Sequence, residues 1–488
     1  MPAAFARMPG RRATLAGPVR ATVDRELLLS RSCGRLSAGF PGIVSRREIS
    51  IFETAFECVP FRGRARDPQG IAAWRFTRDR DFPRNSHLRY EDFAMPVRLF
   101  FRPTLLAALL TSASLPLAAN AQDSGPQLSF GLTTFADVPT SGDTDDDALY
   151  NWRVDIKLNY AEIWSGGSIT GHFEYNDGDG YVGLGEGGLV WPTNTFATLP
   201  SVTSDNDTTL SLSLTQQFNN TTSVSFGKFN VIDLAEATPL VGGQGQGGFQ
   251  YLGIGAPGNF VLPPYIFGGM LTVSYAPMIY TLMIYDANNA QGEDFWDDLF
   301  DEGVVYNGTA TYTTQINGMP GFYSFNIAHS TKKGTDYESL LLDPSDDAFM
   351  STKDGVNYTG VSFQQYLWSD PQNPMVGWGV FGQIGYGDGN PNPLDEMFLL
   401  GIGGNSPLYG RQSDRWGLAW SKYNWSDKLG EALGAYGVKL QDESAVEAFY
   451  EAALTENWRL GGNVMWVKPS FESYDDYTQV GFRIRATF

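Results

Sequence analysis

Cysteine is almost absent from the 488-residue sequence, because its only two cysteines, Cys33 and Cys58, lie in the first 94 residues. The rest of the chain therefore has no disulfide framework, thiolate zinc site or cysteine nucleophile. Histidine is nearly as scarce: only His172 and His329 occur after residue 121. No stretch after that residue has 18 consecutive apolar side chains, which excludes a transmembrane helix there.

Basic side chains are also few after residue 121. Residues 122–488 carry 15 Lys and Arg against 44 Asp and Glu, a net charge of −29. A nucleic-acid-binding protein needs a basic surface, so that class is excluded. Aromatic residues make up 14% of the sequence, whereas disordered acidic chains contain few of them. The long acidic segment is therefore expected to fold.

Residues 95–121 have the three parts of a secretory signal peptide. A short basic segment from Met95 precedes an apolar run, 105–117, and the small-x-small sequence Ala119-Asn120-Ala121. We expect cleavage after Ala121. Residues 1–94 hold 17 Arg and no Lys, with a net charge of +7 and no sustained periodicity. They are interpreted as an over-extended translation start ahead of Met95, the alternative being a disordered basic segment or arm.

The long segment after the leader shows alternating polarity. In 150–160, one face carries aromatic and aliphatic side chains, with the aromatic ones at both ends, and the other face carries polar and charged ones. A strand of an outer-membrane barrel presents apolar side chains to lipid, polar ones to a wet lumen, and aromatic ones at the two interfaces. The same pattern recurs at 210–215, 377–386, 415–421 and 458–466. The fold class expected is therefore all-β: a transmembrane antiparallel β-barrel over 122–488.

Strand-like segments begin near seventeen positions: 127, 151, 167, 208, 222, 269, 278, 303, 321, 356, 375, 396, 413, 434, 445, 457 and 478. Bacterial barrels have even numbers of strands, so the prediction is about sixteen, with fourteen and eighteen as alternatives. A barrel of this size encloses an aqueous channel. The aromatic side chains expected at the lipid interfaces are Tyr150, Trp152, Tyr160, Trp378, Trp416, Trp420, Trp458, Trp466 and Phe488.

Several segments resemble the carbohydrate-selective porins of the OprB type. Segment 401–420 reads GIGGNSPLYGRQSDRWGLAW, like that family's Gly/Pro-rich loop and the Asp-Arg-aromatic-Gly strand that follows it. Glu447-Ala448-Phe449-Tyr450, Trp458–Pro469 and the loop from Gly247 to Tyr265 are also similar. The sequence departs from the family at Gly461-Gly462-Asn463, where a Pro-Asp-x-Gln segment is usual.

The resemblance implies a non-enzymatic outer-membrane porin of a bacterium, through which mono- and oligosaccharides diffuse passively and selectively, with no cofactor or metal. Its expected partners are carbohydrate solutes, outer-membrane lipid and the barrel-assembly machinery, which would recognise the last strand ending at Phe488; a homotrimer is left open. Strand parity and the resemblance together give these pore-lining candidates: Arg153, Asp155, Lys157, Arg411, Asp414, Arg415, Lys439, Glu447, Glu451, Arg459, Arg483 and Arg485. The alternative is that each only solvates the wall and pairs across strands.

Three further features have two interpretations each. The Gly-rich run 241–248 lacks the Lys-Ser/Thr of a phosphate loop, and it either enters the channel as a constriction or is a surface loop. The acidic clusters 143–147, 177–179 and 294–302 are expected to be solvated loops, because none has a complete calcium-loop spacing. By parity His172 faces the lumen beside Ser168, and a wall histidine is favoured over a hydrolase pair.

Two other functions fit the same sequence less well. A general cation-favouring porin would use the −29 charge to concentrate cations at its mouth. A secreted β-rich carbohydrate-binding protein would instead turn its apolar faces inward. The direction in which the apolar faces point therefore distinguishes a membrane barrel from a soluble one.

Overall fold

The structure is a computed structural model that describes residues 125–144, 148–200, 207–235, 240–241, 246–292, 294–408 and 410–488. The expected leader, its cleavage site after Ala121 and residues 1–94 lie outside these ranges.

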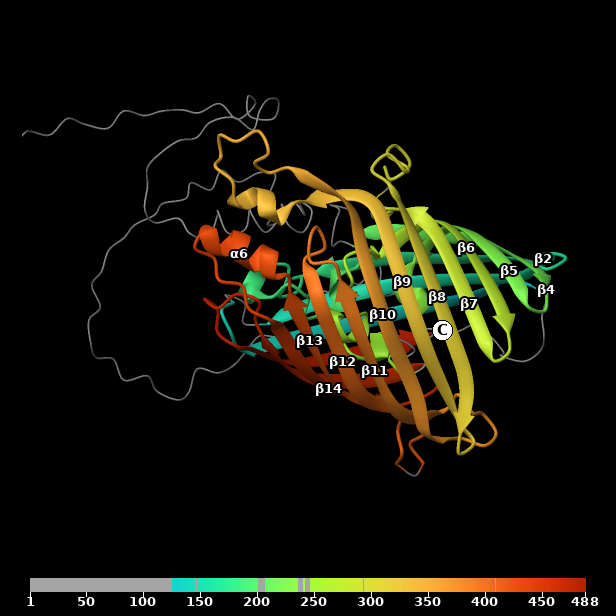
Figure 1. Cartoon of the computed structure of the whole chain (residues 1–488). Coiled ribbons are helices and arrows are strands. Elements are labelled where there is room, and N and C mark those ends of the chain that lie inside the picture. The colour runs from blue at the N-terminus through green and yellow to red at the C-terminus, as the bar shows by residue number, and fades with distance from the viewer. Residues whose placement is uncertain are drawn as a thin grey trace, which may run out of the picture. The chain divides into compact units, whose positions relative to one another are not determined.

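Sixteen antiparallel strands form a closed barrel, in which each strand pairs with its neighbours in sequence and β16 closes against β1. They are β1 (Gln127–Ser141), β2 (Leu149–Trp164), β3 (Gly167–Gly178), β4 (Thr208–Asn219), β5 (Thr222–Asn230), β6 (Tyr265–Tyr275), β7 (Met278–Asp286), β8 (Val304–Ile316), β9 (Met319–Thr335), β10 (Thr352–Ser369), β11 (Gly377–Gly387), β12 (Leu394–Asn405), β13 (Arg415–Trp425), β14 (Glu443–Ala453), β15 (Trp458–Lys468) and β16 (Tyr477–Thr487). Figure 1 shows β6 to β14 side by side around the wall. The predicted barrel of sixteen strands is confirmed.

One of the seventeen predicted strand starts, residue 434, is wrong. That residue lies in the helix α6 (Asp427–Ala435), which Figure 1 shows at one end of the barrel. Ser426 caps the helix, since its hydroxyl accepts a hydrogen bond from the Leu429 amide (3.3 Å). The buried side chains of α6, Leu429, Ala432 and Leu433, are spaced three and four residues apart, as on one face of a helix.

The apolar strand faces point outward. On β4, Leu210, Leu212 and Leu214 are 56%, 48% and 44% exposed, whereas Ser211 and Ser213 between them are buried. On β16, Phe482 is exposed while its neighbour Arg483 is buried. Such an inside-out pattern suits a wall between lipid and a polar interior, and closure leaves no unpaired strand edge in the hydrocarbon.

The two ends of the barrel differ in their connections. At one end, β2–β3, β4–β5, β6–β7 and β8–β9 are joined by two-residue turns. The start of β1 lies at this end beside Phe488, since Phe130 and Phe488 exchange two backbone hydrogen bonds of 2.8 Å. The opposite end carries the β3–β4, β5–β6, β7–β8 and β9–β10 connections, all much longer. In outer-membrane barrels short turns face the periplasm and long loops the exterior.

The barrel interior contains parts of two long connections. The β3–β4 connection includes η1 (Glu186–Gly188) and α3 (Thr195–Thr198), and the β5–β6 connection includes α4 (Val231–Ala235) and α5 (Leu252–Gly255). The β9–β10 connection contains a further short helix, η3 (Tyr337–Leu341). Among the described residues, no helix has the length and apolar character needed to cross a membrane.

Candidate pore constriction

The β5–β6 connection crosses the bore and contacts three parts of the wall. Near its start, Asp233 of α4 bonds to side chains of β2 and β3. The amide of Leu240 then donates to Gln364 Oε1 of β10 (2.8 Å). Farther on, the Gln246 side chain donates to Asp155 Oδ2 of β2 (2.6 Å), and the carbonyl of Gly247 accepts from Arg483 of β16 (2.6 Å). Of the two interpretations of the Gly-rich run, the described residues 246–248 therefore support insertion into the channel.

The β3–β4 connection packs beside it and completes the constriction. The Asn194 side chain caps α3 and donates to Asp137 Oδ2 of β1 (2.6 Å). The amide of Thr195 donates to the carbonyl of Gln250 (2.8 Å), and the amide of Leu252 to that of Pro192 (3.0 Å). These bonds join the two connections directly, so they form one inserted body.

Aromatic contacts fix this inserted body against β11, β13 and β14. Trp191 packs on Phe260 and on Tyr423, with ring centroids 4.9 and 5.1 Å apart. Phe249 meets Phe449 edge to face at 4.8 Å. Aromatic pairs at such distances add stabilisation beyond the area that they bury. The aromatic side chains of the inserted body are therefore held in a packed core rather than solvated.

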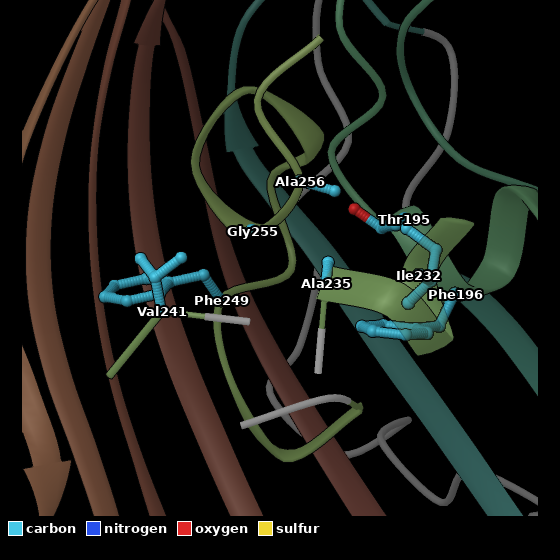
Figure 2. Close-up of a pocket in the computed structure, with 8 residues that line it drawn as sticks. All are labelled: Thr195, Phe196, Ile232, Ala235, Val241, Phe249, Gly255 and Ala256. Carbon is cyan, nitrogen blue, oxygen red and sulfur yellow. The ribbon is translucent and has the colours of Figure 1, made fainter. Parts of the chain in front are cut away.

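Figure 2 shows the space that remains between α3, α4 and α5. Its lining consists of Thr195, Phe196, Ile232, Ala235, Val241, Phe249, Gly255 and Ala256. The cavity measures about 10 Å³, which is barely the room that one water molecule requires. This cavity therefore has no room for a solute larger than a water molecule.

A group of charged side chains on β2 and β3, which we call the β2–β3 cluster, lies beside the constriction: Arg153, Asp155, Lys157, His172, Glu174 and the α4 residue Asp233. Arg153 donates to Asp155 (2.7 Å) and also bonds to Glu174. His172 bridges Asp155 (2.9 Å) and Asp233 (2.6 Å) through its two ring nitrogens. Acidic and basic members are thus paired with one another.

Asp233 ties α4 to this cluster. Its carboxylate also accepts from Lys157 Nζ at 2.8 Å. Burial raises the pKa of Asp233, but the hydrogen bond from His172 and the charges of His172 and Lys157 outweigh it and lower that pKa below its usual range. The carboxylate is therefore ionised at neutral pH and holds α4 to the wall.

A second group, the β14–β16 cluster, contains Glu447, Glu451, Arg459, Arg483, Arg485 and the β13 residue Arg415. Glu451 is fully buried and accepts two bonds from Arg485, of 3.1 and 2.9 Å. Arg459 forms an ion pair with the same carboxylate at 3.5 Å. The guanidinium of Arg483 lies 5.5 Å from the centre of the Phe449 ring. With Arg415, Arg459, Arg483 and Arg485 together, this side of the bore is rich in guanidinium donors.

Members of both clusters combine water access with an inward position. The side chains of Lys157, Asp233, Arg459 and Arg485 are 38%, 29%, 26% and 23% exposed. Arg459 and Arg485 lie toward the short-turn ends of their strands. The water-accessible charges thus border the bore next to the inserted body and also closer to the short-turn end of the barrel.

Asp155, His172 and Glu174 offer ligand atoms within 4.8 Å of one another. Arg153, however, donates to both carboxylates, so its positive charge stands where a metal ion would have to bind. The partners of His172 are carboxylates, rather than the serine hydroxyl that a hydrolase would require. The arrangement suits a charged wall better than a metal or catalytic centre.

Three predicted lining residues lie away from the two clusters. Lys439 is in the β13–β14 connection, where its largely exposed ammonium pairs with Glu472 at 3.2 Å; it was assigned to the wall because 434 was mistaken for a strand start. Arg411 and Asp414 lie in the β12–β13 turn and bond to each other at 2.7 Å. Asp414 also accepts from the Tyr450 hydroxyl and the Ala453 amide, so it ties this turn to β14.

The predicted interface aromatics all lie on the outward face. Tyr150 and Trp466 lie near the long-connection ends of β2 and β15. The opposite rim carries four rings in two contacting pairs, Trp378 with Trp416 (6.2 Å) and Trp458 with Phe488 (6.3 Å). Trp152 contacts Tyr175 at 5.0 Å. Trp420 lies halfway along β13 and so away from either end, and Tyr160 lies toward the short-turn end of β2.

Sequence reasoning missed Asp233 and Glu443 as residues of the constriction. Glu443 lies four residues before Glu447 and so on the same strand face, which parity could have revealed. Asp233 lies in a connection without periodicity, so no local signal marked it, whereas Gln246 lies within the Gly-rich run 241–248. Two residues of the predicted acidic clusters have partners: Glu302 pairs with Lys332 (2.6 Å), and Asp179 accepts a hydrogen bond from the Tyr150 amide (3.0 Å). Residues 145–147 of the first cluster lie outside the described residues.

Comparisons with known proteins identify a family and similar solved structures. Residues 159–488 match the model of a family described as carbohydrate-selective porin, OprB family. The high-pH structure of Pseudomonas putida OprB is similar with a TM-score of 0.61 at 15% identity, over 75% of this chain and 95% of that one. Pseudomonas aeruginosa OccK11 (OpdR) gives a TM-score of 0.42 at 8% identity, over 74% of this chain and 96% of that one. No curated protein matches the sequence.

Proposed function

Since the chain belongs to the OprB family of carbohydrate-selective porins, we propose that sugars cross the bore along the water-accessible charges of the β2–β3 and β14–β16 clusters. The protein is a bacterial outer-membrane β-barrel porin for carbohydrates. The observation that carries the proposed path is the partial exposure of Lys157, Asp233, Arg459 and Arg485 inside a closed wall. The crevice between α3, α4 and α5 is too small for a sugar.

The pairing of charges explains why a neutral solute would pass. Within the β2–β3 cluster each carboxylate has a cationic partner, and Glu451 has two. Paired charges impose little net electrostatic barrier on a neutral molecule, whereas the same guanidinium and carboxylate groups offer donors and acceptors to its hydroxyls. Selectivity would arise because a sugar replaces its lost water contacts with these groups, while an apolar solute does not.

Liposome swelling and planar bilayers test this proposal. We expect mono- and oligosaccharides to permeate faster than amino acids of similar size, and glucose or maltose to block the ion current. Arg485→Gln removes a guanidinium from the path, and losing one charged hydrogen bond of about 1.5–3 kcal/mol corresponds to roughly tenfold or more weaker block. Lys439→Gln makes the same charge change on an exposed connection and should leave block unchanged. Equal permeation by sugars and amino acids would refute the preference.

We further propose that the mature chain begins at Gln122, after removal of a leader that starts at Met95. Intact-mass spectrometry of the protein from outer membranes checks this, and a mass that includes residues before 122 would refute it.

We also propose that β16 engages the barrel-assembly machinery and that the barrel forms a homotrimer. Deletion of Phe488 should then reduce the amount of assembled barrel, and native mass spectrometry should detect three copies.

A further inference from the structure

Strand β14 contacts both connections that narrow the bore. Its inward face carries Glu443 and Glu447, four residues apart, and both side chains are completely buried. An isolated buried carboxylate is costly, so such a group is expected to have several hydrogen-bond donors. Each of these two carboxylates finds them in the backbone of an inserted connection.

Glu443 holds the β3–β4 connection. Its two carboxylate oxygens accept from the consecutive amides of Val190 (2.6 Å) and Trp191 (3.1 Å). The hydroxyl of Ser470 donates to the same group at 2.6 Å. The Tyr251 hydroxyl, which belongs to the other connection, donates to it as well.

Glu447 holds the β5–β6 connection in the same manner. Its oxygens accept from the consecutive amides of Gln250 (2.8 Å) and Tyr251 (3.0 Å), and the Asn463 side chain of β15 donates to it at 3.0 Å. Gln250 and Tyr251 follow directly on the segment that contacts Asp155 and Arg483. Glu447 therefore fixes a segment that lies directly against the charged wall.

We propose that Glu443 and Glu447 are positioning residues that set the aperture of the pore. A carboxylate that accepts from two consecutive amides fixes both the distance and the orientation of a backbone segment, because each oxygen has its own donor. Two such contacts on one strand place the two connections relative to the same part of the wall. The inference rests on the proposed pore function, because an aperture has meaning only if solute passes the inserted body.

The test is the size limit of the channel in Glu443→Gln and Glu447→Gln. A glutamine amide nitrogen cannot accept from a backbone N–H, so each substitution keeps the side-chain size and removes one of the paired contacts. We expect noisier single-channel currents and permeation by polyethylene glycols that the wild-type channel excludes. Glu447→Asp keeps the charge but shortens the side chain, and a smaller shift in the same direction is expected. Glu456→Gln makes the same chemical change on the exposed β14–β15 turn and serves as control.

The possible outcomes distinguish failure of this inference from failure of the proposed carbohydrate path. An unchanged size limit in both glutamine variants overturns the inference. Failure of Glu443→Gln, Glu447→Gln and Glu447→Asp to form barrels, judged by heat-modifiable migration in gels, also overturns it, because the contacts would then serve folding rather than aperture. A wild-type channel that conducts ions without sugar block refutes the proposed carbohydrate path, while the change of size limit in the variants still supports the role of the two carboxylates.

Discussion

Gly247 lies at a point where the β5–β6 connection comes very close to the wall. A Cβ at this position would lie 2.5 and 2.7 Å from the two carboxylate oxygens of Glu451. Glu451 has little freedom to move aside, since it is fully buried and bonded to Arg485 and Arg459. Only glycine therefore permits the carbonyl of Gly247 to reach Arg483.

Gly247→Ala should consequently displace the inserted segment. Overpacking a tightly packed site costs about 1–3 kcal/mol, and we expect a lower temperature for the gel shift between folded and unfolded barrel, together with altered conductance. Gly430→Ala in α6 is the control, because its added Cβ meets no atom within 4 Å. A Gly247→Ala channel with wild-type conductance and stability would show that the connection does not approach Glu451 this closely.

At the scale of the strand, the alternation of side chains determines which substitutions the barrel tolerates. Leu212 and Phe218 both face outward on β4, and they are 48% and 65% exposed. Leu212 lies in the middle of the strand, whereas Phe218 is next to its last residue. The two positions therefore differ in depth within the membrane but not in strand face.

We expect Leu212→Arg to destabilise the barrel by about 2–4 kcal/mol, the cost of a cation at the bilayer midplane, and Phe218→Arg by about 0–1 kcal/mol, as near an interface. Equilibrium unfolding of the refolded barrel in lipid vesicles measures both. Equal, small costs at the two positions would contradict the assignment of this face to lipid.

The strands could be predicted because their signal is local. Period-two polarity predicted the barrel and the inward side of Arg153, Asp155 and Arg483, and the rule of even strand numbers reduced seventeen strand-like starts to sixteen strands. The mistaken strand start at 434 has a local cause too, since Tyr436, Val438 and Leu440 alternate with smaller or polar residues as in a strand, although they follow α6 in the β13–β14 connection. For the Gly-rich run 241–248 the sequence left channel insertion and a surface loop equally open, because the contacts of Leu240 with β10 and of Gln250 with β14 join residues more than a hundred positions apart.

At the scale of the whole molecule, charge is distributed unevenly between bore and connections. The charges of the bore are largely paired, yet residues 122–488 carry a net charge of −29. Exposed acidic side chains in the β7–β8 and β9–β10 connections account for part of that excess: Asp297, Asp298, Asp301, Asp343, Asp346 and Asp347. The negative potential therefore belongs to the long-connection end more than to the path itself.

This distribution predicts an ion preference that depends on salt. At 0.01 M the Debye length is about 30 Å, so the acidic connections should concentrate cations at the mouth, and at 1 M it is about 3 Å, so they should not. Reversal potentials in a salt gradient should accordingly show a cation preference that fades as ionic strength rises, and replacing Asp297, Asp298 and Asp301 with Asn should weaken it. Sugar block depends on direct contact and should persist at high salt. A cation preference of equal strength at 1 M would instead locate the selecting carboxylates inside the bore. Among the carboxylates of the two clusters, Asp233 is the one with an exposed side chain. That outcome would favour a general cation-selective porin over a carbohydrate path.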